Sequence, residues 1–371
     1  MRKIVFVIGI MGNGGAERVV ATLSNYLSKK KYDISIITIY GDRKDYQLDE
    51  NVKYIPIICK SENKLYRPIE RIKTIRQKLK AINPNCVISF LADVNIHTLF
   101  ATRGLNIPLI LSERNDPNND PSIRWQRVIR NKIYRWCDGI VFQTIGALEY
   151  FNTLLSPKVN RIVIPNPVSS QLPYHLQDEK CTRFITACRL SKQKNLPLMI
   201  DAVFELVKKG YDCTLDIFGD GPLKPILEDY INTIDLSNRI KLKGFSPNIH
   251  YEMTQSVAFV ISSNYEGISN SMLEALAIGL PVIATDCPIG GAKDSIEDGV
   301  NGFLVPVGDK ESLAFAMERV LNSDKLRKKI GSEAMKIREK LSIEVIGECW
   351  HQFIEEVIHN IIQHNQDEEG K

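Results

Sequence analysis

The chain has 371 residues, of which 44% are hydrophobic and 25% are charged, close to the values of ordinary globular domains. This composition argues against a disordered, collagenous or coiled-coil protein, and no apolar stretch approaches the about 18 residues that a membrane span needs. Residues 1–180 carry 27 Lys and Arg against 16 Asp and Glu, whereas residues 181–371 carry 21 against 28. The asymmetry predicts two bodies, of which the basic one faces a phosphate-bearing ligand, a nucleic acid or an anionic membrane.

The first half of the chain alternates apolar runs with helical stretches. Residues 4–11 follow a basic start and imitate a signal peptide, but charged residues stand where a cleavage site needs small ones, so we expect a buried strand. A glycine-rich turn, a helix over 16–27 and a strand over 34–40 follow. Further elements are expected as strands at 87–91, 109–112 and 139–143 and a helix at 123–137. Such alternation predicts a mostly parallel sheet covered on both faces.

The second half begins a new series of the same kind. Its predicted elements are strands at 183–189, 214–218, 240–242, 257–262 and 281–284, helices at 196–209, 223–234, 249–255 and 271–278, and an apolar segment at 303–305. We therefore predict an α/β protein with two doubly wound, Rossmann-like domains, residues 1–170 and 181–345. Residues 166–180 would form the linker, and residues 346–371 a terminal helix and tail that pack back toward the first domain. Two such sheets facing each other would enclose one cleft at the carboxyl ends of their strands.

Gly12-x-Gly14-Gly15 follows the first strand and opens a helix. Glycines let the backbone approach a ligand closely, and a helix N-terminus offers N–H groups to an anion. The spacing is not that of a dinucleotide fingerprint, which argues against an NAD-dependent dehydrogenase. A tight turn that binds no ligand remains the alternative.

The segment from Glu266 to Glu274 is the most informative stretch of the sequence. It places Glu266 in a loop after a strand, and Glu274 on the first turns of the next helix. The N–H groups around Asn270 and Ser271 lie at the positive end of that helix, where a diphosphate would fit. The two carboxylates would accept hydrogen bonds from sugar hydroxyls on either side. The alternative, a solvated helix residue, is disfavoured by the apolar neighbours of Glu274.

Two cations complete this candidate site. Arg189 ends the strand that opens the second half, and Lys194 lies just before the next helix. They would neutralise the charge on a departing nucleotide diphosphate, as a metal ion does in other enzymes. We therefore expect no metal and no cofactor, since the sequence has no Asp-x-Asp pair or His/Asp cluster. The eight cysteines form no Cys-x-x-Cys pair and are expected to be reduced thiols of a cytoplasmic protein.

Together these motifs resemble the retaining GT-B glycosyltransferases of family four. The resemblance covers nearly the whole chain in the family's motif order and rests on Gly14-Gly15-Ala16-Glu17-Arg18-Val19, Arg189…Lys194-Asn195, Gly219-Asp220-Gly221-Pro222 and Glu266 to Val282. Within the family, Ser112-Glu113-Arg114-Asn115 and Gly290-Gly291-Ala292-Lys293-Asp294 are similar to bacterial enzymes that extend undecaprenyl-diphosphate-linked oligosaccharides, among them N-acetylgalactosaminyltransferases. Some relatives have a histidine after the Ser-Glu pair, where this chain has Arg114.

The resemblance implies a role for each candidate residue. Arg189 and Lys194 would hold the donor diphosphate, Glu274 would bind the ribose hydroxyls, and Glu266 would face the donor sugar. The remaining contacts with the donor would come from Gly14, Gly15, Ser246, Asn270 and Ser271. The implied reaction moves a hexose or N-acetylhexosamine, with retention, from a UDP-sugar to a lipid-linked glycan acceptor. A GDP-mannose-dependent mannosyltransferase and a GT-B nucleotide-sugar epimerase are the alternatives.

Basic segments account for the charge of the first half. Eight cations face only two acids and partly recur at helical spacing beside an apolar stripe: Lys60, Lys64, Arg67, Arg71, Lys73, Arg76, Lys78 and Lys80. A second basic set surrounds Trp125 and Trp136. Such helices suit an anionic leaflet or an acceptor pyrophosphate, although a solvated face is the alternative. We expect a cytoplasmic protein held peripherally on the inner face of the cell membrane, with no nucleic-acid partner. The candidate acceptor or membrane contacts are Glu113, Arg114, Arg71 and Arg76.

Overall fold

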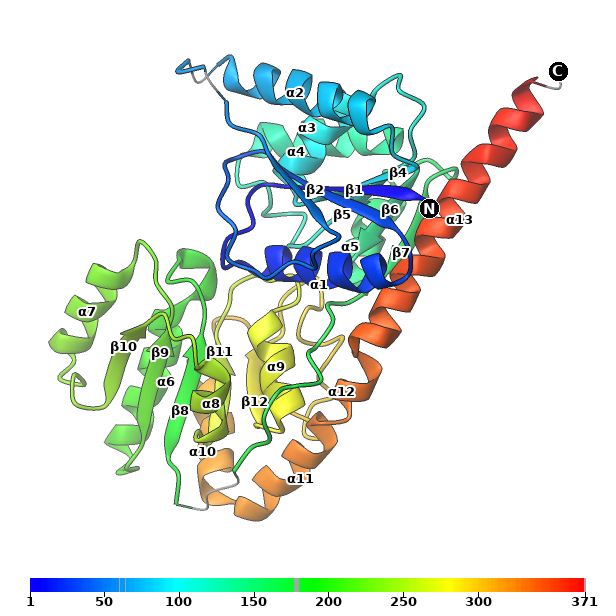
Figure 1. The fold of residues 1–371 in the computed structure, drawn as a ribbon. Helices are drawn as coiled ribbons and strands as arrows, with labels where there is room; N and C mark the ends of the chain where they lie inside the picture. The colour runs from blue at the N-terminus through cyan, green and yellow to red at the C-terminus, as the bar shows by residue number, and fades with distance from the viewer. Residues whose placement is uncertain (60, 64, 177–179, 370–371) are drawn as a thin grey trace. The chain divides into compact units, whose positions relative to one another are not determined.

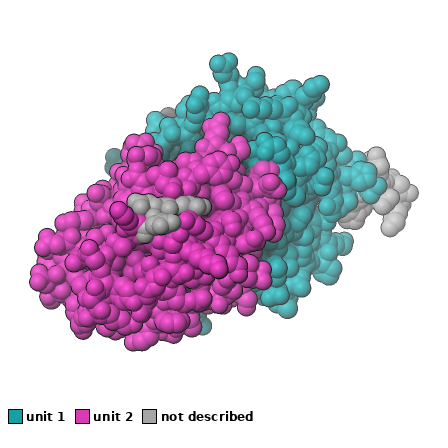
Figure 2. Space-filling view, turned by 90° about the horizontal axis from the view of Figure 1, so that it is seen from below, with its two compact units in different colours: residues 1–167, 343–371 teal, residues 168–342 magenta. Residues whose placement is uncertain are grey.

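The computed structural model describes residues 1–59, 61–63, 65–176 and 180–369 (Figure 1). The chain forms two compact units, coloured separately in Figure 2: unit 1 comprises residues 1–167 and 343–371, and unit 2 comprises residues 168–342. The sequence-based boundaries at 170 and 345 lie close to these divisions. Lys60, Lys64 and residues 177–179 of the predicted linker lie outside the described residues.

Unit 1 contains a seven-stranded parallel sheet in the order β3-β2-β1-β4-β5-β6-β7. Its strands are β1 (Lys3–Ile8), β2 (Asp33–Thr38), β3 (Lys53–Pro56), β4 (Cys86–Phe90), β5 (Leu109–Ser112), β6 (Gly139–Phe142) and β7 (Asn160–Val163). The central strands are continuous apolar runs, as expected of strands buried on both faces. The order of the strands reverses between β1 and β4, and this switch point is where ligands bind in open α/β sheets.

Seven helical segments accompany this sheet in the described part of unit 1 (Figure 1). They are α1 (Gly15–Lys29), α2 (Arg67–Ile82), α3 (Ala92–Thr102), α4 (Arg124–Ile133), the 3₁₀ turn η1 (Tyr134–Trp136), α5 (Ile145–Asn152) and α13 (Ile343–Glu369). The last of these comes from the end of the chain. Trp350 on α13 is fully buried, and its ring stacks on Phe90 with the centroids 5.7 Å apart. A Cβ at Gly139 would lie 2.9 Å from Val357, so the missing side chain allows α13 to approach β6.

Unit 2 contains a six-stranded parallel sheet in the order β10-β9-β8-β11-β12-β13. Its strands are β8 (Arg183–Ala187), β9 (Thr214–Phe218), β10 (Ile240–Gly244), β11 (Ala258–Ile261), β12 (Val282–Thr285) and β13 (Phe303–Val305). Its helices are η2 (Lys192–Lys194), α6 (Leu196–Lys208), α7 (Lys224–Thr233), α8 (Ile249–Thr254), α9 (Asn270–Ile278), α10 (Lys310–Asn322), α11 (Asp324–Ala334) and α12 (Ile337–Lys340). The strand order reverses between β8 and β11.

Two differences from the predicted elements affect the site. The strand predicted over 183–189 ends at Ala187, so Arg189 lies in the loop beyond it. The helix predicted over 123–137 is α4 followed by a 3₁₀ turn, which places Tyr134 in the core. In the residues that the structure describes, no helix is both long enough and apolar enough to cross a membrane. None of the eight cysteines, all of which lie in the described residues, forms a disulfide bond.

Candidate active site

The centre of the candidate site lies at the switch point of unit 2, between the loops that follow β8 and β11. Lys194 comes from the first loop, and its ammonium group donates a hydrogen bond to Oε2 of Glu266 in the second. Ser263 Oγ donates to the same carboxylate oxygen at 3.2 Å. The sequence therefore located both residues correctly at this edge of the sheet. It did not predict that they pair with each other.

Further hydrogen bonds hold the two loops together. Asn264 donates its backbone N–H to the carbonyl of Gln193 at 2.8 Å, and Gln193 Nε2 donates to the carbonyl of Tyr265 at 3.0 Å. Ser262 Oγ donates to the carbonyl of Lys194 at 2.9 Å. The backbone of both loops is thus fixed on either side of the ion pair, which is what a preorganised site requires.

Two glycines allow loops to approach this centre closely. A Cβ at Gly291 would lie 1.6 Å from the carbonyl oxygen of Gly267, next to Glu266. A Cβ at Gly219 would lie 1.9 Å from the carbonyl oxygen of Cys188, and Gly219 has a φ of +116°. Both positions belong to motifs noted in the sequence, and the structure explains them as backbone contacts that any side chain would block.

The ion pair lies largely out of water. The side chains of Lys194 and Glu266 are 16% and 17% exposed. Burial alone would lower the pKa of Lys194, but the Glu266 carboxylate offsets this and the pKa is raised above its usual value. Lys194 is therefore charged at neutral pH. An ammonium group has three N–H donors, so the bond to Glu266 leaves donors for an anionic ligand.

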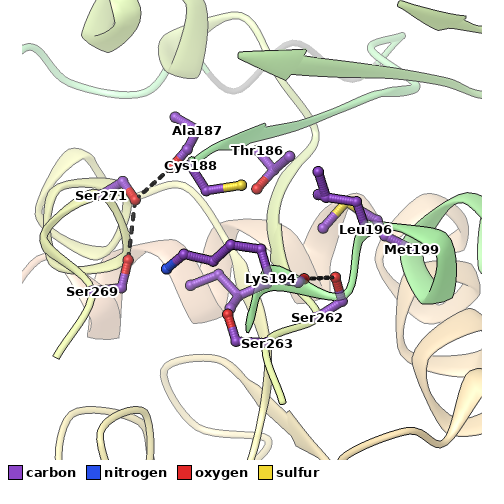
Figure 3. A pocket seen from close by; sticks show the side chains of 11 residues that line it. Thr186, Ala187, Cys188, Lys194, Leu196, Met199, Ser262, Ser263, Ser269 and Ser271 are labelled. Carbon is purple, nitrogen blue, oxygen red and sulfur yellow. Dashed lines mark hydrogen bonds between the residues drawn. The ribbon is translucent and has the colours of Figure 1, made fainter. Parts of the chain in front are cut away.

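The start of α9 borders the pocket that Lys194 lines. Figure 3 shows the ammonium end of Lys194 on the same side of this pocket as Ser269 and Ser271. Ser269 caps α9 by accepting the backbone N–H of Met272, and Ser271 Oγ donates to the carbonyl of Ala187 at 2.9 Å. The second bond attaches the first turn of α9 to the end of β8. Asn270, the first residue of α9, lies in this turn. The turn presents the positive end of a helix dipole beside a lysine.

Glu274 lies on the second turn of the same helix and is only 8% exposed. Its Oε2 is 3.2 Å from Nε2 of His250 on α8. The burial of Glu274 agrees with the expectation that it is not a solvated helix residue. His250 was not singled out in the sequence, because a single histidine 24 positions away along the chain gives no local signal.

Arg189 and Ser246 lie at the same edge of the sheet as Lys194 but apart from its hydrogen bonds. Arg189 is exposed in the loop after β8, and no described residue forms a hydrogen bond or an ion pair with it. Ser246 follows β10, where its Oγ accepts the backbone N–H of Asn248 at 3.2 Å. Phe245 beside it is 68% exposed. Their roles in binding the diphosphate and the base stay predictions.

Gly14 and Gly15 lie at the switch point of unit 1. The Glu17 carboxylate folds back over this turn, and a Cβ at Gly14 would lie 2.0 Å from Glu17 Oε2. Burial raises the pKa of Glu17, while a hydrogen bond from its own backbone N–H opposes the shift. The group nearest to that Cβ is therefore the flexible end of a side chain of the same helix, so this contact alone does not require a glycine at position 14. Binding of a diphosphate or an acceptor at this turn stays a prediction.

A second pocket, this one in unit 1, has a volume of about 240 Å³. It is lined by Arg71 and by Arg67 from the first turn of α2. Arg71 Nε donates to the carbonyl of Ile39 at 3.1 Å, and its guanidinium lies 4.5 Å from the ring centroid of Tyr40. Arg67 Nε donates to the carbonyl of Ser61 at 2.9 Å. Each guanidinium is thus oriented through Nε, and within the described residues no hydrogen bond engages its terminal nitrogens.

Arg76, which the sequence suggested as a contact for the acceptor or the membrane, forms hydrogen bonds with the end of α3. Its Nη1 donates to the carbonyls of Ala101 and Arg103, at 3.0 and 2.6 Å. These carbonyls end α3, so the guanidinium caps the negative end of that helix. Arg76 therefore has a structural role at the end of α3, and its contact with an acceptor or a membrane stays a prediction.

Glu113 cannot contact a membrane surface, because its side chain is 1% exposed, and that part of the prediction is wrong. Its Oε1 accepts hydrogen bonds from Tyr134 and from Asn95, and the pKa of Glu113 is raised by burial. Arg114 lies with its guanidinium 4.5 Å from the ring of Phe90 and donates to Asn166 Oδ1 at 2.9 Å. Its Nε and Nη2 are shielded from solvent, so a membrane contact through them is also excluded.

Comparison with known proteins identifies the family. Residues 172–337 match the pattern described as Glycosyl transferases group 1, and residues 13–172 match that of Glycosyltransferase Family 4. A Campylobacter jejuni relative, N-acetylgalactosamine-N,N'-diacetylbacillosaminyl-diphospho-undecaprenol 4-alpha-N-acetylgalactosaminyltransferase, is 30% identical over 90% of this chain and 94% of its own. The chain belongs to the family 4, group 1 glycosyltransferases. The enzyme also shares 29% identity, over 96% of its chain and 99% of the relative, with the Campylobacter jejuni transferase that adds alpha-1,4-N-acetyl-D-galactosamine to GalNAc-alpha-(1->4)-GalNAc-alpha-(1->3)-diNAcBac-PP-undecaprenol.

Solved structures of the same fold support the architecture of this glycosyltransferase. Sucrose-phosphate synthase from Thermosynechococcus elongatus matches with a TM-score of 0.84 at 16% identity, covering 97% of this chain and 100% of its own. HepE of Anabaena, in complex with UDP and glucose, matches with a TM-score of 0.81 at 17% identity, covering 96% of this chain and 100% of its own. The prediction of a GT-B fold built from two Rossmann-like domains is therefore confirmed.

Proposed function

We propose that this glycosyltransferase moves a hexose or N-acetylhexosamine, with retention of configuration, from a UDP-sugar to a lipid-linked glycan. The acceptor class follows the names of the two Campylobacter jejuni relatives, which act on glycans attached to undecaprenyl diphosphate. The choice of UDP is supported by the Anabaena structure of the same fold that holds UDP and glucose. The product would be a longer glycan for a cell-surface polysaccharide or glycoconjugate.

The observation that carries this proposal is the buried pair of Lys194 and Glu266 beside the first turn of α9. In a retaining transfer without a protein nucleophile, the bond to the diphosphate breaks as the acceptor attacks the same face of the sugar. The leaving oxygen then takes the acceptor proton. The protein must stabilise the negative charge that develops on the diphosphate and hold the acceptor close. Lys194 and the N–H groups around Asn270 and Ser271 would supply the first requirement, and Glu274 would bind the ribose.

Metal independence is part of the proposal. The positive charge of Lys194, with that of Arg189 in the adjoining loop, would replace a divalent cation at the diphosphate. Transfer measured in excess EDTA should then proceed at the rate measured without it. A loss of transfer that Mg²⁺ or Mn²⁺ restores would contradict this part alone.

A labelled-donor assay tests the reaction itself. UDP-GlcNAc, UDP-GalNAc, UDP-glucose and GDP-mannose are each incubated with the enzyme, with and without undecaprenyl-diphosphate-linked oligosaccharide. We expect label in the lipid fraction only when a UDP-sugar and the acceptor are both present. Label from GDP-mannose would favour the mannosyltransferase, and an isomerised nucleotide sugar without acceptor would favour the epimerase.

The pocket of Arg67 and Arg71 is our candidate for the anionic part of the acceptor. Two guanidinium groups four residues apart on α2 line it, and both are oriented by bonds from Nε to backbone carbonyls. Guanidinium groups held in this way bind phosphate oxygens in a bidentate manner. Arg71→Gln should raise the KM for the lipid-linked acceptor and leave that for the donor unchanged.

The outer surface of α2, α3 and α4 supports an association with an anionic membrane. Among residues 65–136 every exposed charged side chain is basic, namely Lys73, Lys78, Lys80, Arg103, Arg124, Lys132 and Arg135. Exposed apolar side chains lie among them, including Tyr66 at 62%, Ile69 at 48% and Trp125 at 60%. Basic and aromatic residues in this mixture favour the headgroup region of an anionic leaflet. We propose that the enzyme works on the inner face of the cell membrane.

Vesicle sedimentation tests the membrane proposal. We expect binding to vesicles that contain anionic lipid and weak binding to neutral ones, with the difference lost in high salt. Lys132→Glu combined with Arg135→Glu should abolish the preference, and Lys208→Glu on unit 2 serves as the matched control. Equal binding of the unchanged enzyme to both kinds of vesicle would contradict the electrostatic part.

A further inference from the structure

His250 lies where two predicted parts of the nucleotide site meet. It is the second residue of α8, the short helix that follows the loop of Phe245 and Ser246. Helix α8 packs against α9, which carries Glu274. A residue at this position can therefore connect the loop expected to contact the base with the carboxylate expected to bind the ribose.

The contact between His250 and Glu274 is short and screened from water. His250 Nε2 lies 3.2 Å from Glu274 Oε2, and the Glu274 side chain is 10% exposed. The Nε2 atom is shielded from solvent and forms no hydrogen bond in this structure. A buried ring nitrogen without a hydrogen bond is unfavourable by about 1–3 kcal/mol. In the tautomer that carries its proton on Nε2, this nitrogen needs an acceptor. The Glu274 carboxylate, whose Oε2 lies 3.2 Å away, can accept this hydrogen bond after a small rotation of either side chain.

The shielding of Nε2 also limits what His250 can do. Solvent does not reach Nε2, so this nitrogen cannot itself bind a ribose hydroxyl, and through it His250 acts on the ligand by way of Glu274. The His250 side chain as a whole is 35% exposed, so the test below separates this role from a direct contact. A carboxylate that accepts two hydroxyl groups must present its oxygens in a fixed orientation, and a neighbouring donor supplies that restraint.

We propose that His250 is a positioning residue that orients the Glu274 carboxylate toward the ribose hydroxyls of the donor nucleotide. This inference rests on the proposed function, since it takes Glu274 to be the ribose ligand. It adds a residue that the family motifs in the sequence do not contain. It also explains why a histidine with little local context lies against the α9 helix.

The test compares the binding of UDP with that of 2′,3′-dideoxy-UDP by isothermal titration calorimetry. The unchanged enzyme should bind the dideoxy nucleotide much more weakly, because the buried carboxylate loses its hydroxyl partners. His250→Leu should weaken the binding of UDP about tenfold and leave that of dideoxy-UDP unchanged, which reduces the discrimination between them. His250→Gln, which keeps an N–H at a similar reach, should restore most of the discrimination.

Each outcome separates the two proposals. Should His250→Leu keep full discrimination, or weaken both nucleotides by the same factor, the positioning role is overturned while Glu274 remains the ribose ligand. An unchanged enzyme that binds both nucleotides equally overturns the role of Glu274 itself, and with it the inference. If His250→Leu does not fold, His250→Asn replaces it in the comparison with His250→Gln. The asparagine side chain is too short for its N–H to reach the Glu274 carboxylate. Tyr251→Leu is the matched control, because Tyr251 is adjacent on α8 and 61% exposed.

Discussion

Replacing Lys194 by methionine should separate the stability of the enzyme from its catalysis. The substitution keeps much of the volume of the side chain but leaves the Glu266 carboxylate buried without its cation. Removing one partner of a buried ion pair costs about 3–5 kcal/mol, and the 16% and 17% exposure of the two side chains favours the lower value. For a domain of this size, a loss of about 3 kcal/mol lowers the Tm by about 6–12 °C.

The double variant Lys194→Met/Glu266→Gln supplies the decisive comparison. It removes both charges, so we expect it to regain most of the lost Tm while its kcat stays about 10²- to 10³-fold below that of the unchanged enzyme. Thermal unfolding and single-turnover transfer at saturating donor measure the two quantities. A Lys194→Met enzyme with an unchanged Tm would refute the buried pair. A double variant that recovers transfer would refute the role of Lys194 at the leaving diphosphate.

Three other substitutions test separate parts of the structure. Arg189→Ala should raise the activation barrier by about 2–4 kcal/mol and so lower kcat at saturating donor. A decrease in kcat of less than about threefold would show that this arginine does not bind the diphosphate. Gly291→Ala should lower both the Tm and the affinity for UDP, because its Cβ would lie 1.6 Å from the carbonyl oxygen of Gly267. Burial raises the pKa of Asp120 to about 7, so the folded enzyme binds this proton more tightly than the unfolded chain and loses stability as the pH rises from about 4 to 7. Asp120→Asn should therefore be about 4 kcal/mol more stable than the unchanged enzyme at pH 8 and nearly equal to it near pH 4, as urea unfolding at both values would measure.

The sequence predicted the parts of the site that depend on local pattern. Glu266 and Glu274 were placed correctly, in a loop and on a helix, because a strand, a glycine turn and a capped helix follow each other within a short stretch. Lys194 was placed at the correct strand end for the same reason. The pairing of Lys194 with Glu266 was not predictable, since 72 residues separate them and only the order of β8 and β11 in the sheet brings them together.

Burial was the main property that the sequence did not reveal. Glu113 and Arg114 are a charged pair after a strand, which in sequence is equally consistent with a surface and with the core. The structure buries Glu113 because Tyr134 and Asn95, from two other elements, supply donors for its carboxylate. Arg76 belongs to a basic run that predicts a solvated or membrane-facing helix, yet the end of α3 provides carbonyl acceptors for it. In each case the deciding partner is distant along the chain.

The return of the last helix to unit 1 has a consequence for the synthesis of the protein. Residues 1–167 emerge from the ribosome first, but the side chains that cover part of their sheet, Trp350 and Val357 among them, emerge last. Unit 2 is continuous in sequence, so it can complete its core while unit 1 still lacks a helix. A nascent or truncated chain that stops before Ile343 would therefore expose apolar surface on its amino-terminal body and become a target for chaperones.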